Sequence, residues 1–212
     1  MSATAAMPAP RPGRVPAARI ALAVAASVAG VAACAFAFSA LWPQAPAAPR
    51  PARLSAADAA SARAIVTSAQ RLVSVTPAQL GYALRVAGPV PGIRAQTDTA
   101  AHRITLFVSP NDAPHVVAHD LAHEIGHAFD ARRLTPAQRA AYLRARGVPR
   151  APWFPNGTAS DYRSGAGDFA EVFALCHAAS PVYRSRLAPR PADPCRVLPA
   201  TARGTNLREG GS

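Results

Sequence analysis

Lysine is absent from the 212-residue chain, so all 23 basic residues are arginines, and their excess over 11 acidic residues gives a net charge of +12. Such a charge suggests nucleic acid, but aromatic residues make up only 6% of the chain, and no RNA- or DNA-binding motif or aromatic platform accompanies the scattered arginines. Alanine and proline are also abundant, which is typical of a compositional bias. We therefore expect no nucleic-acid partner, and at most a weak attraction to anionic membrane or cell-wall surfaces.

Glutamate is scarce, with three residues in the whole chain: Glu124, Glu171 and Glu209. The first lies in segment 123–127, which reads His-Glu-Ile-Gly-His, and at these residue frequencies a chance HExxH is expected in only about two chains in a thousand. On a helix this spacing puts His123 and His127 on one face, where they can bind one Zn²⁺ while Glu124 faces the metal-activated water. The motif predicts a zinc hydrolase.

Cysteine is limited to three residues: Cys34, Cys176 and Cys195. Cys34 lies in an apolar segment near the N-terminus, so Cys176 and Cys195 are the pair left in the remaining chain. In an oxidising compartment they can form one disulfide, which would stabilise the fold by about 3 kcal/mol in the chain-entropy model. Two buried free thiols are the alternative.

Charge is missing from residues 20–42, a run that is mostly Ala, Val, Leu and Phe. Its length matches the roughly 20 residues that a helix needs to cross a bilayer. Arginines precede this run and no acidic residue does, so the positive-inside rule keeps the N-terminus in the cytoplasm and exports everything after Trp42. We therefore expect a single-pass signal anchor that holds an extracytoplasmic domain at the cell membrane.

Two other interpretations of residues 20–42 remain open. Residues 35–37, Ala-Phe-Ala, offer small residues at the spacing of a cleavage site, so the segment could be a removed signal peptide and the protein secreted. Residues 31–34, Val-Ala-Ala-Cys, resemble a lipobox that would leave the protein lipid-anchored at Cys34. The length of the apolar run favours the uncleaved anchor, and all three interpretations export the domain.

The exported part contains both helical and strand patterns. Four segments have helical periodicity or capping signals: 56–73, 113–132, 135–146 and 167–178. Three segments bounded by turns are expected to form a short antiparallel sheet: 82–86, 93–96 and 103–108. The motif helix must carry both a metal face and a core face, so we expect a small α+β domain with the site on the floor of a cleft. The loop 147–157 either walls this cleft or packs Trp153 over the core.

A catalytic zinc needs three protein ligands, so the two histidines demand a third one downstream. Asp168 and Glu171 lie three residues apart on one face of the apolar segment 167–178. A carboxylate there is expensive to bury unpaired, which favours metal ligation or a hydrogen bond to a ligating histidine. His119 continues the four-residue spacing backward, but the helical face drifts, so we expect it near the site rather than on it.

The segment 123–130, His-Glu-Ile-Gly-His-Ala-Phe-Asp, is followed some forty residues later by Tyr162 and a helix of the form Glu-x-Phe-Ala. This arrangement resembles the zinc peptidases related to anthrax lethal factor and the clostridial Pro-Pro endopeptidases, which belong to the zincins. The resemblance covers roughly residues 82–178. It implies a zincin-like fold, zinc held by the two motif histidines and the downstream Glu, Glu124 as general base, and Tyr162 close to the reacting carbonyl.

The chain departs from that family at the downstream helix, which usually reads Glu-x-Phe-Ala-Glu. One alignment puts Gly167 at the ligand position, so Asp168 would have to substitute; the other makes Glu171 the ligand and places Leu175 at the supporting position. We favour Glu171, because a longer side chain reaches the metal more easily, and keep Asp168 as the rival. The carboxylate that does not bind zinc would support a ligand.

We therefore expect a zinc metallopeptidase with a peptide or protein substrate, and a membrane contact through its N-terminal helix. A strand of the sheet, with 103–108 as the candidate, would offer its edge to an extended peptide. A catalytically inactive zinc-binding interaction domain is the alternative. The expected parts are a basic cytoplasmic N-terminus (1–19), a transmembrane anchor (20–42), a Pro/Ala tether (43–54), the metallopeptidase domain (55–199) and a disordered tail (200–212).

Overall fold

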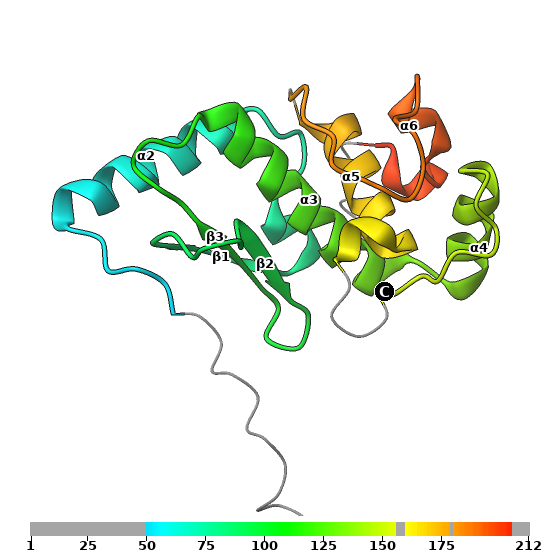
Figure 1. The fold of residues 1–212 in the computed structure, drawn as a ribbon, viewed down its shortest axis with the longest axis horizontal. Helices are drawn as coiled ribbons and strands as arrows, with labels where there is room; N and C mark the ends of the chain where they lie inside the picture. The colour runs from blue at the N-terminus through cyan, green and yellow to red at the C-terminus, as the bar shows by residue number, and fades with distance from the viewer. Residues whose placement is uncertain (1–49, 156–159, 179, 205–212) are drawn as a thin grey trace, which may run out of the picture. The chain divides into compact units, whose positions relative to one another are not determined.

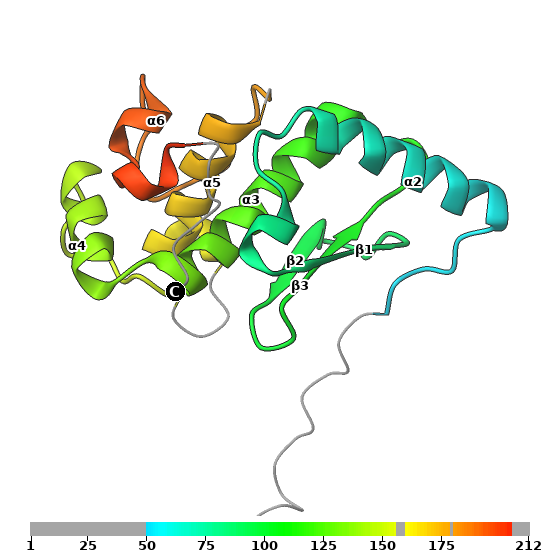
Figure 2. The same ribbon diagram turned by 180° about the vertical axis from the view of Figure 1, so that it is seen from behind.

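Helix α3 (Pro114–Arg133) carries the HExxH motif and packs against two other helices and the sheet. The computed structural model describes residues 50–155, 160–178 and 180–204. Within them, α3 contacts α2 (Ala56–Arg71) along one side and α5 (Gly165–His177) along another, as both views show (Figure 1, Figure 2). Leu121, Ile125 and Phe129 of α3 are buried, as their helical spacing predicts.

Three short strands form a mixed sheet in the order β1-β3-β2: β1 (Ala83–Ala87), β2 (Ala95–Asp98) and β3 (Arg103–Phe107). β3 pairs in parallel with β1 and antiparallel with β2, so the prediction of an antiparallel sheet is wrong for β1. The fully buried Ile104 and Leu106 give β3 the most apolar face, and this strand takes the centre, where both of its edges are hydrogen-bonded.

The predicted α+β class is confirmed, and each predicted helix and strand is present with ends shifted by a few residues. Two further helices are α4 (Pro136–Ala145) and the short α6 (Pro194–Val197). α4 begins at a capping box, in which the Thr135 hydroxyl accepts from the Gln138 N–H and the Gln138 side-chain carbonyl accepts from the Thr135 N–H. The described part of the chain also contains three 3-10 turns: η2 (Pro77–Leu80), η3 (Asp161–Arg163) and η4 (Ala200–Ala202).

Gly126, inside the motif, allows α3 and α5 to approach closely. A Cβ placed there would lie 2.8 Å from the Ala170 Cα and 3.2 Å from the Phe173 Cβ, so a side chain would force the helices apart. Phe129 and Phe173 pack their rings beside this crossing, with centroids 5.7 Å apart. The crossing brings the polar residues of the two helices within hydrogen-bonding reach.

The predicted N-terminal segments 1–19 and 20–42 lie outside the described residues, as does most of the tether 43–54. Among the residues described, no helix has both the length and the apolar character that a membrane span requires. At the end of the tether, Ala52 donates its N–H to the Pro89 carbonyl and Leu54 packs against the core. This end of the tether is therefore part of the folded domain.

The C-terminal end of α5 is tied to two other segments. Cys176 forms the predicted disulfide with Cys195, which lies in the first turn of α6. The buried His177 bonds the Ser74 hydroxyl through Nδ1 at 2.9 Å and the Ala202 carbonyl through Nε2 at 2.8 Å. Ala202 is fully buried in η4, so the prediction of a disordered tail from residue 200 onward is wrong for its first residues, while 205–212 lie outside the described part.

We predict that His177→Ala lowers the free energy of unfolding at pH 7 by about 1–3 kcal/mol, because it leaves the carbonyl of the buried Ala202 without its partner and removes the bond to the Ser74 hydroxyl. Chemical denaturation measures this loss. The exposed His115 on α3 supplies the control, since His115→Ala is expected to change stability by less than about 0.5 kcal/mol.

The same variant has a pH signature. Burial lowers the pKa of His177 below its usual 6.5, against the opposing hydrogen bond with Ala202. Below pH 6.5 the unfolded chain therefore takes up a proton that the folded chain rejects, and stability falls as pH falls. The stability difference between the wild type and His177→Ala should shrink as pH falls below 6.5, and a difference that grows would contradict a neutral His177.

Candidate metal centre

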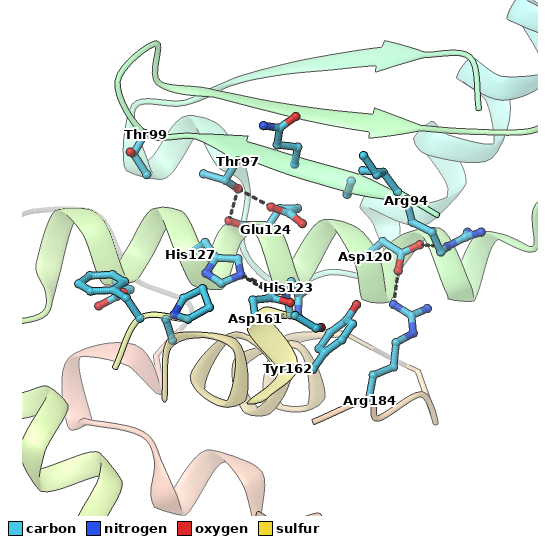
Figure 3. Close-up of a pocket in the computed structure, with 18 of the residues that line it drawn as sticks. Arg94, Thr97, Thr99, Asp120, His123, Glu124, His127, Asp161, Tyr162 and Arg184 are labelled. Atoms are coloured by element: carbon cyan, nitrogen blue, oxygen red, sulfur yellow. Dashed lines mark hydrogen bonds and ion pairs between the residues drawn. The ribbon is translucent and has the colours of Figure 1, made fainter. Parts of the chain in front are cut away.

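Three potential ligand atoms from two separate segments converge beside α3. The Nε2 atoms of His123 and His127 lie 3.1 Å apart, and Oδ2 of Asp161 lies 3.2 Å from the first and 3.1 Å from the second (Figure 3). These residues form a group able to hold a metal ion. The expected pairing of His123 and His127 on one face of the helix is therefore seen, and Asp161 is the carboxylate that accompanies them.

The separations suit a small tetrahedral ion. Zinc bonds to nitrogen and oxygen of about 2.0–2.1 Å put neighbouring ligand atoms about 3.3–3.4 Å apart, because a tetrahedral edge is about 1.63 times the bond length. The three observed separations of 3.1–3.2 Å come within a few tenths of an ångström of that value. Two imidazoles and one carboxylate are also a donor set found in catalytic rather than structural zinc sites. The residues present therefore fit Zn²⁺.

Asp161 is positioned by the N-terminus of α5. Its carbonyl accepts a hydrogen bond from the Ser164 hydroxyl at 2.7 Å, and the same hydroxyl caps the helix by accepting from the Gly167 N–H. A Cβ on Gly167 would lie 2.1 Å from the Asp161 carbonyl oxygen. The missing side chain at position 167 thus makes room for the turn that presents Asp161 to the histidines.

Asp161 differs from both carboxylates that the sequence predicts, because it precedes helix α5 instead of lying on it. A usable signal was present, since Asp161 directly precedes Tyr162, which the family resemblance had already placed at the site. Gly167 occupies the position that one alignment gives to the family's ligand Glu. A chain that has glycine at that position needs its third ligand from elsewhere, and the space left by the glycine is filled by the segment that carries Asp161.

Glu171, the favoured third ligand, does not join this group. It is fully buried behind the histidines, where Oε1 lies 2.9 Å from Nδ1 of His123 and 3.1 Å from Nε2 of His119, and Oε2 accepts from the Arg184 N–H. It therefore bonds the side of the His123 ring that faces away from Asp161. Burial alone would raise the pKa of Glu171, but the hydrogen bonds from His119 and His123 hold it down at about 2.

Asp168, the rival, lies in a different buried network. Its carboxylate accepts two bonds from the Arg146 guanidinium, at 2.7 and 3.1 Å, and further bonds from three hydroxyls: Tyr142 at 2.7 Å, Tyr183 at 3.2 Å and Ser185 at 2.6 Å. With five hydrogen bonds on a fully buried carboxylate, Asp168 has an internal partner for each oxygen and lies in none of the contacts of the metal group. Its place is structural.

Glu124 lies beside the metal group and lines the same cleft. It is not part of the candidate metal group, and its Oε2 accepts a hydrogen bond from the Thr97 hydroxyl at 2.7 Å (Figure 3). The same hydroxyl lies 3.0 Å from the Glu124 backbone carbonyl. Thr97 belongs to β2, so the sheet holds the carboxylate of the motif in place, a contact that the sequence did not indicate.

Tyr162 also lines the cleft, with its ring 5.5 Å from that of His123 and tilted by 64°. Burial raises the pKa of Tyr162 above its usual 10, while the neighbouring Arg184 guanidinium opposes the rise. The phenol therefore stays protonated at neutral pH and can donate a hydrogen bond to a ligand in the cleft.

Without a metal ion, His123 is protonated at neutral pH. Although burial disfavours the imidazolium, hydrogen bonds to Asp161 and Glu171 and the nearby charge of Glu124 raise the pKa of His123 to about 10. Asp161 responds in the opposite sense: burial would raise its pKa, but the hydrogen bonds from His123 and His127 hold it well below its usual range. A cation entering here would replace this proton as the partner of the carboxylates.

The cleft has a volume of about 770 Å³ and is bounded by the edge of the sheet on one side. Residues 95–97 of β2 line it, and among the described residues β2 is an outer strand that pairs with β3 alone. β3 was the strand expected to offer its edge, but it lies in the centre with both edges bonded, so that prediction is wrong. The edge strand available to a peptide is β2.

Segment 147–157 also contributes to the cleft wall, and its described residues bear out both interpretations of this loop. Trp153 packs against the core rings of Tyr142 and Phe169 and donates its indole N–H to Asp130. Phe154 is 58% exposed and lines the cleft together with Pro155. One aromatic residue of the loop therefore anchors it, and the next faces the cleft.

No family model matches this chain, and no curated protein and no solved structure is significantly similar to it.

Proposed function

We infer that the chain is a zinc-dependent peptidase whose metal ligands are His123, His127 and Asp161. The observation that carries this function is the convergence of those three ligand atoms in a cleft that also holds Glu124 and the edge of β2. Asp161 replaces Glu171 and Asp168 as third ligand, because its carboxylate lies with the Nε2 atoms of both histidines.

When bound, Zn²⁺ would act as a Lewis acid that polarises the peptide carbonyl and acidifies water. Glu124 is placed to take a proton from the attacking water and to return it to the departing amine, and Thr97 holds its carboxylate for this task. Tyr162 keeps its proton and can donate it in a hydrogen bond to the developing oxyanion. The backbone of β2 can bind an extended substrate by strand addition.

Glu171 and His119 support the first ligand. The Glu171 carboxylate bonds Nδ1 of His123, which turns Nε2 toward His127 and Asp161 and fixes the tautomer needed for metal binding. His119 shares the same carboxylate oxygen and is fully buried, as expected for a residue near the site rather than on it.

We also propose that the domain works outside the cytoplasm, held at the membrane by residues 20–42 or released from it. The disulfide between Cys176 and Cys195 supports this location, because such bonds persist in oxidising compartments. An inactive zinc-binding interaction domain remains the alternative function, but zinc binding alone requires neither Glu124 nor the bond from Thr97 that orients it.

We predict that Glu124→Gln keeps one bound zinc and loses at least about 100-fold in peptidase activity, because the general base is removed and the ligands are not. Metal content is measured by atomic emission and activity on a broad peptide library. Asp98→Asn, at the exposed end of β2, is the control and should retain activity. If the wild type binds zinc and cleaves nothing in the library, the interaction domain is the better description.

Substitution of the three candidate carboxylates should separate their roles. Asp161→Ala is expected to strip the zinc, Glu171→Gln to weaken zinc binding by about 10–100-fold, and Asp168→Asn to leave stoichiometric zinc on the folded protein. Asp168→Asn should instead lower the free energy of unfolding by about 3–5 kcal/mol, since it leaves the buried Arg146 without its ion-pair partner. Zinc retained by Asp161→Ala and lost from Glu171→Gln would reverse the assignment.

Zinc binding should release a proton at neutral pH. The pKa of about 10 on metal-free His123 means that the ion displaces a proton at any pH below that value, so the apparent affinity should rise about tenfold per pH unit between pH 6 and 8. Titration calorimetry in two buffers of different ionisation enthalpy counts the protons released. An affinity independent of pH over this range would contradict the charged state of His123.

A further inference from the structure

Asp120 lies one turn before His123 on α3 and receives a guanidinium group on each carboxylate oxygen. Arg94 donates from Nε to Oδ2 at 2.7 Å, and Arg184 donates from Nη1 to Oδ1 (Figure 3). Arg94 directly precedes β2 and Arg184 follows α5, so three elements meet at this point. All three residues line the cleft, and the peptidase mechanism above uses none of them.

Within the cleft lining, two guanidinium groups share the single carboxylate of Asp120. Asp112, which lies outside the lining, is a second ion-pair partner of Arg94, with its Oδ1 3.4 Å from the guanidinium nitrogens. A guanidinium has five N–H donors, and the contacts of Arg184 to Asp120 and Tyr162 engage fewer than that number. The side chains of Arg94 and Arg184 are 41% and 27% exposed, so both can reach a ligand in the cleft.

The ligand that suits this pair is a carboxylate. Guanidinium groups bind carboxylates through parallel N–H bonds, and the buried Asp120, only 4% exposed, holds both groups in place before a ligand arrives. A site whose donors are already fixed loses less entropy on binding than one that must be ordered. The opposite end of the cleft differs, because it presents Phe154 and Pro155.

The direction of β2 determines which half of a bound peptide, before or after the cleaved bond, lies near Arg94 and Arg184. The strand runs from Ala95, next to Arg94, toward Thr99 at the other end of the cleft (Figure 3). A peptide added antiparallel to this edge, which is the more stable pairing per residue, runs from Thr99 toward Arg94. Its C-terminal half therefore approaches Arg94 and Arg184.

The distance from the metal group is short. Asp120 and His123 are three helical residues apart, a rise of about 4.5 Å, whereas an extended peptide advances about 3.4 Å per residue. One or two residues after the scissile bond therefore suffice to bring a carboxylate to the arginines.

We propose that Arg94 and Arg184 form a carboxylate-binding subsite that selects peptides with a carboxylate on the first or second residue after the cleaved bond. That carboxylate is either the side chain of Asp or Glu or the free C-terminus of a short peptide. The subsite rests on the proposed peptidase function and names the class of substrate.

Matched peptides separate the two sources of the carboxylate. In the first set every peptide has an amidated C-terminus, and the two members of a pair differ only by Asp or Asn at one position before or after the cleaved bond. In the second set no peptide has an acidic side chain, and the two members of a pair differ only by a free or an amidated C-terminus. On the full-length wild type, we expect kcat/KM to favour the carboxylate in one set by about 10–100-fold, as for a charge-assisted hydrogen bond. The preference should appear only after the cleaved bond.

Arg94→Gln and Arg184→Gln should each reduce that preference to within about threefold. The preference is a ratio of two peptides on one enzyme preparation, so a partly unfolded variant does not distort it. Arg139→Gln is the matched control, because Arg139 also lines the cleft and also pairs with a buried aspartate of α3, Asp130, but lies beside Phe154. It should leave the ratio unchanged.

Binding of the same peptides to zinc-loaded Glu124→Gln tests the subsite without catalysis. We expect the peptide with the carboxylate to bind more tightly than its partner, and the double variant Arg184→Gln/Glu124→Gln to lose this difference. This result supports the subsite even if the wild type cleaves no peptide; in that case only the proposed peptidase function fails. Cleavage without any carboxylate preference, or equal binding of both members of every pair, would overturn the subsite, as would a preference located before the cleaved bond.

Discussion

The close crossing of α3 and α5 at Gly126 is the contact on which the site depends. With no side chain at Gly126, the backbone of α5 at Ala170 comes near enough for Glu171 to reach the histidines of α3. A carboxylate buried this deeply is costly unless its oxygens are bonded, and here His119, His123 and the Arg184 N–H supply the bonds. The requirement to satisfy Glu171 thus orients the ring of His123.

The same crossing places the first turn of α5 under the metal group. Gly167 lets the preceding turn lie against the helix, and Ser164 ties the Asp161 carbonyl to the helix cap. Asp168, one residue further on, is held by Arg146 and anchors the N-terminal end of α5 to α4. A structural network on one side of the helix therefore supports Asp161, the proposed ligand, on the turn before it.

Residues 183–185 join these networks. Ser185 donates to Asp168, the Arg184 N–H donates to Glu171, and the Arg184 guanidinium donates to Asp120 in the cleft. This short segment thus contacts the Asp168 network, the Glu171 carboxylate that bonds His123, and the Asp120 carboxylate in the cleft. The proposed carboxylate subsite and the proposed metal ligands therefore share supporting contacts, which is how a small domain can hold a rigid site on few elements.

Much of this fold could be predicted from local patterns. The helices around residues 56–71 and 114–133 follow from apolar spacing, and the two motif histidines share a face because helical geometry alone puts residues four apart together. The strand order was out of reach, because alternation marks β3 as a strand without saying that it lies between β1 and β2.

The sequence by itself determined that His123 and His127 lie on one face with Glu124 beside them, since their spacing on one helix needs no tertiary contact. The tertiary structure alone decided the third partner. Asp161 lies 38 and 34 residues from the two histidines, and it meets them because Gly167 and Gly126 let a turn and a helix approach. Residue type made Glu171 and Asp168 candidates for the third ligand. Only packing shows which carboxylate lies beside the two histidines in the cleft and which ones are fully engaged in internal hydrogen bonds.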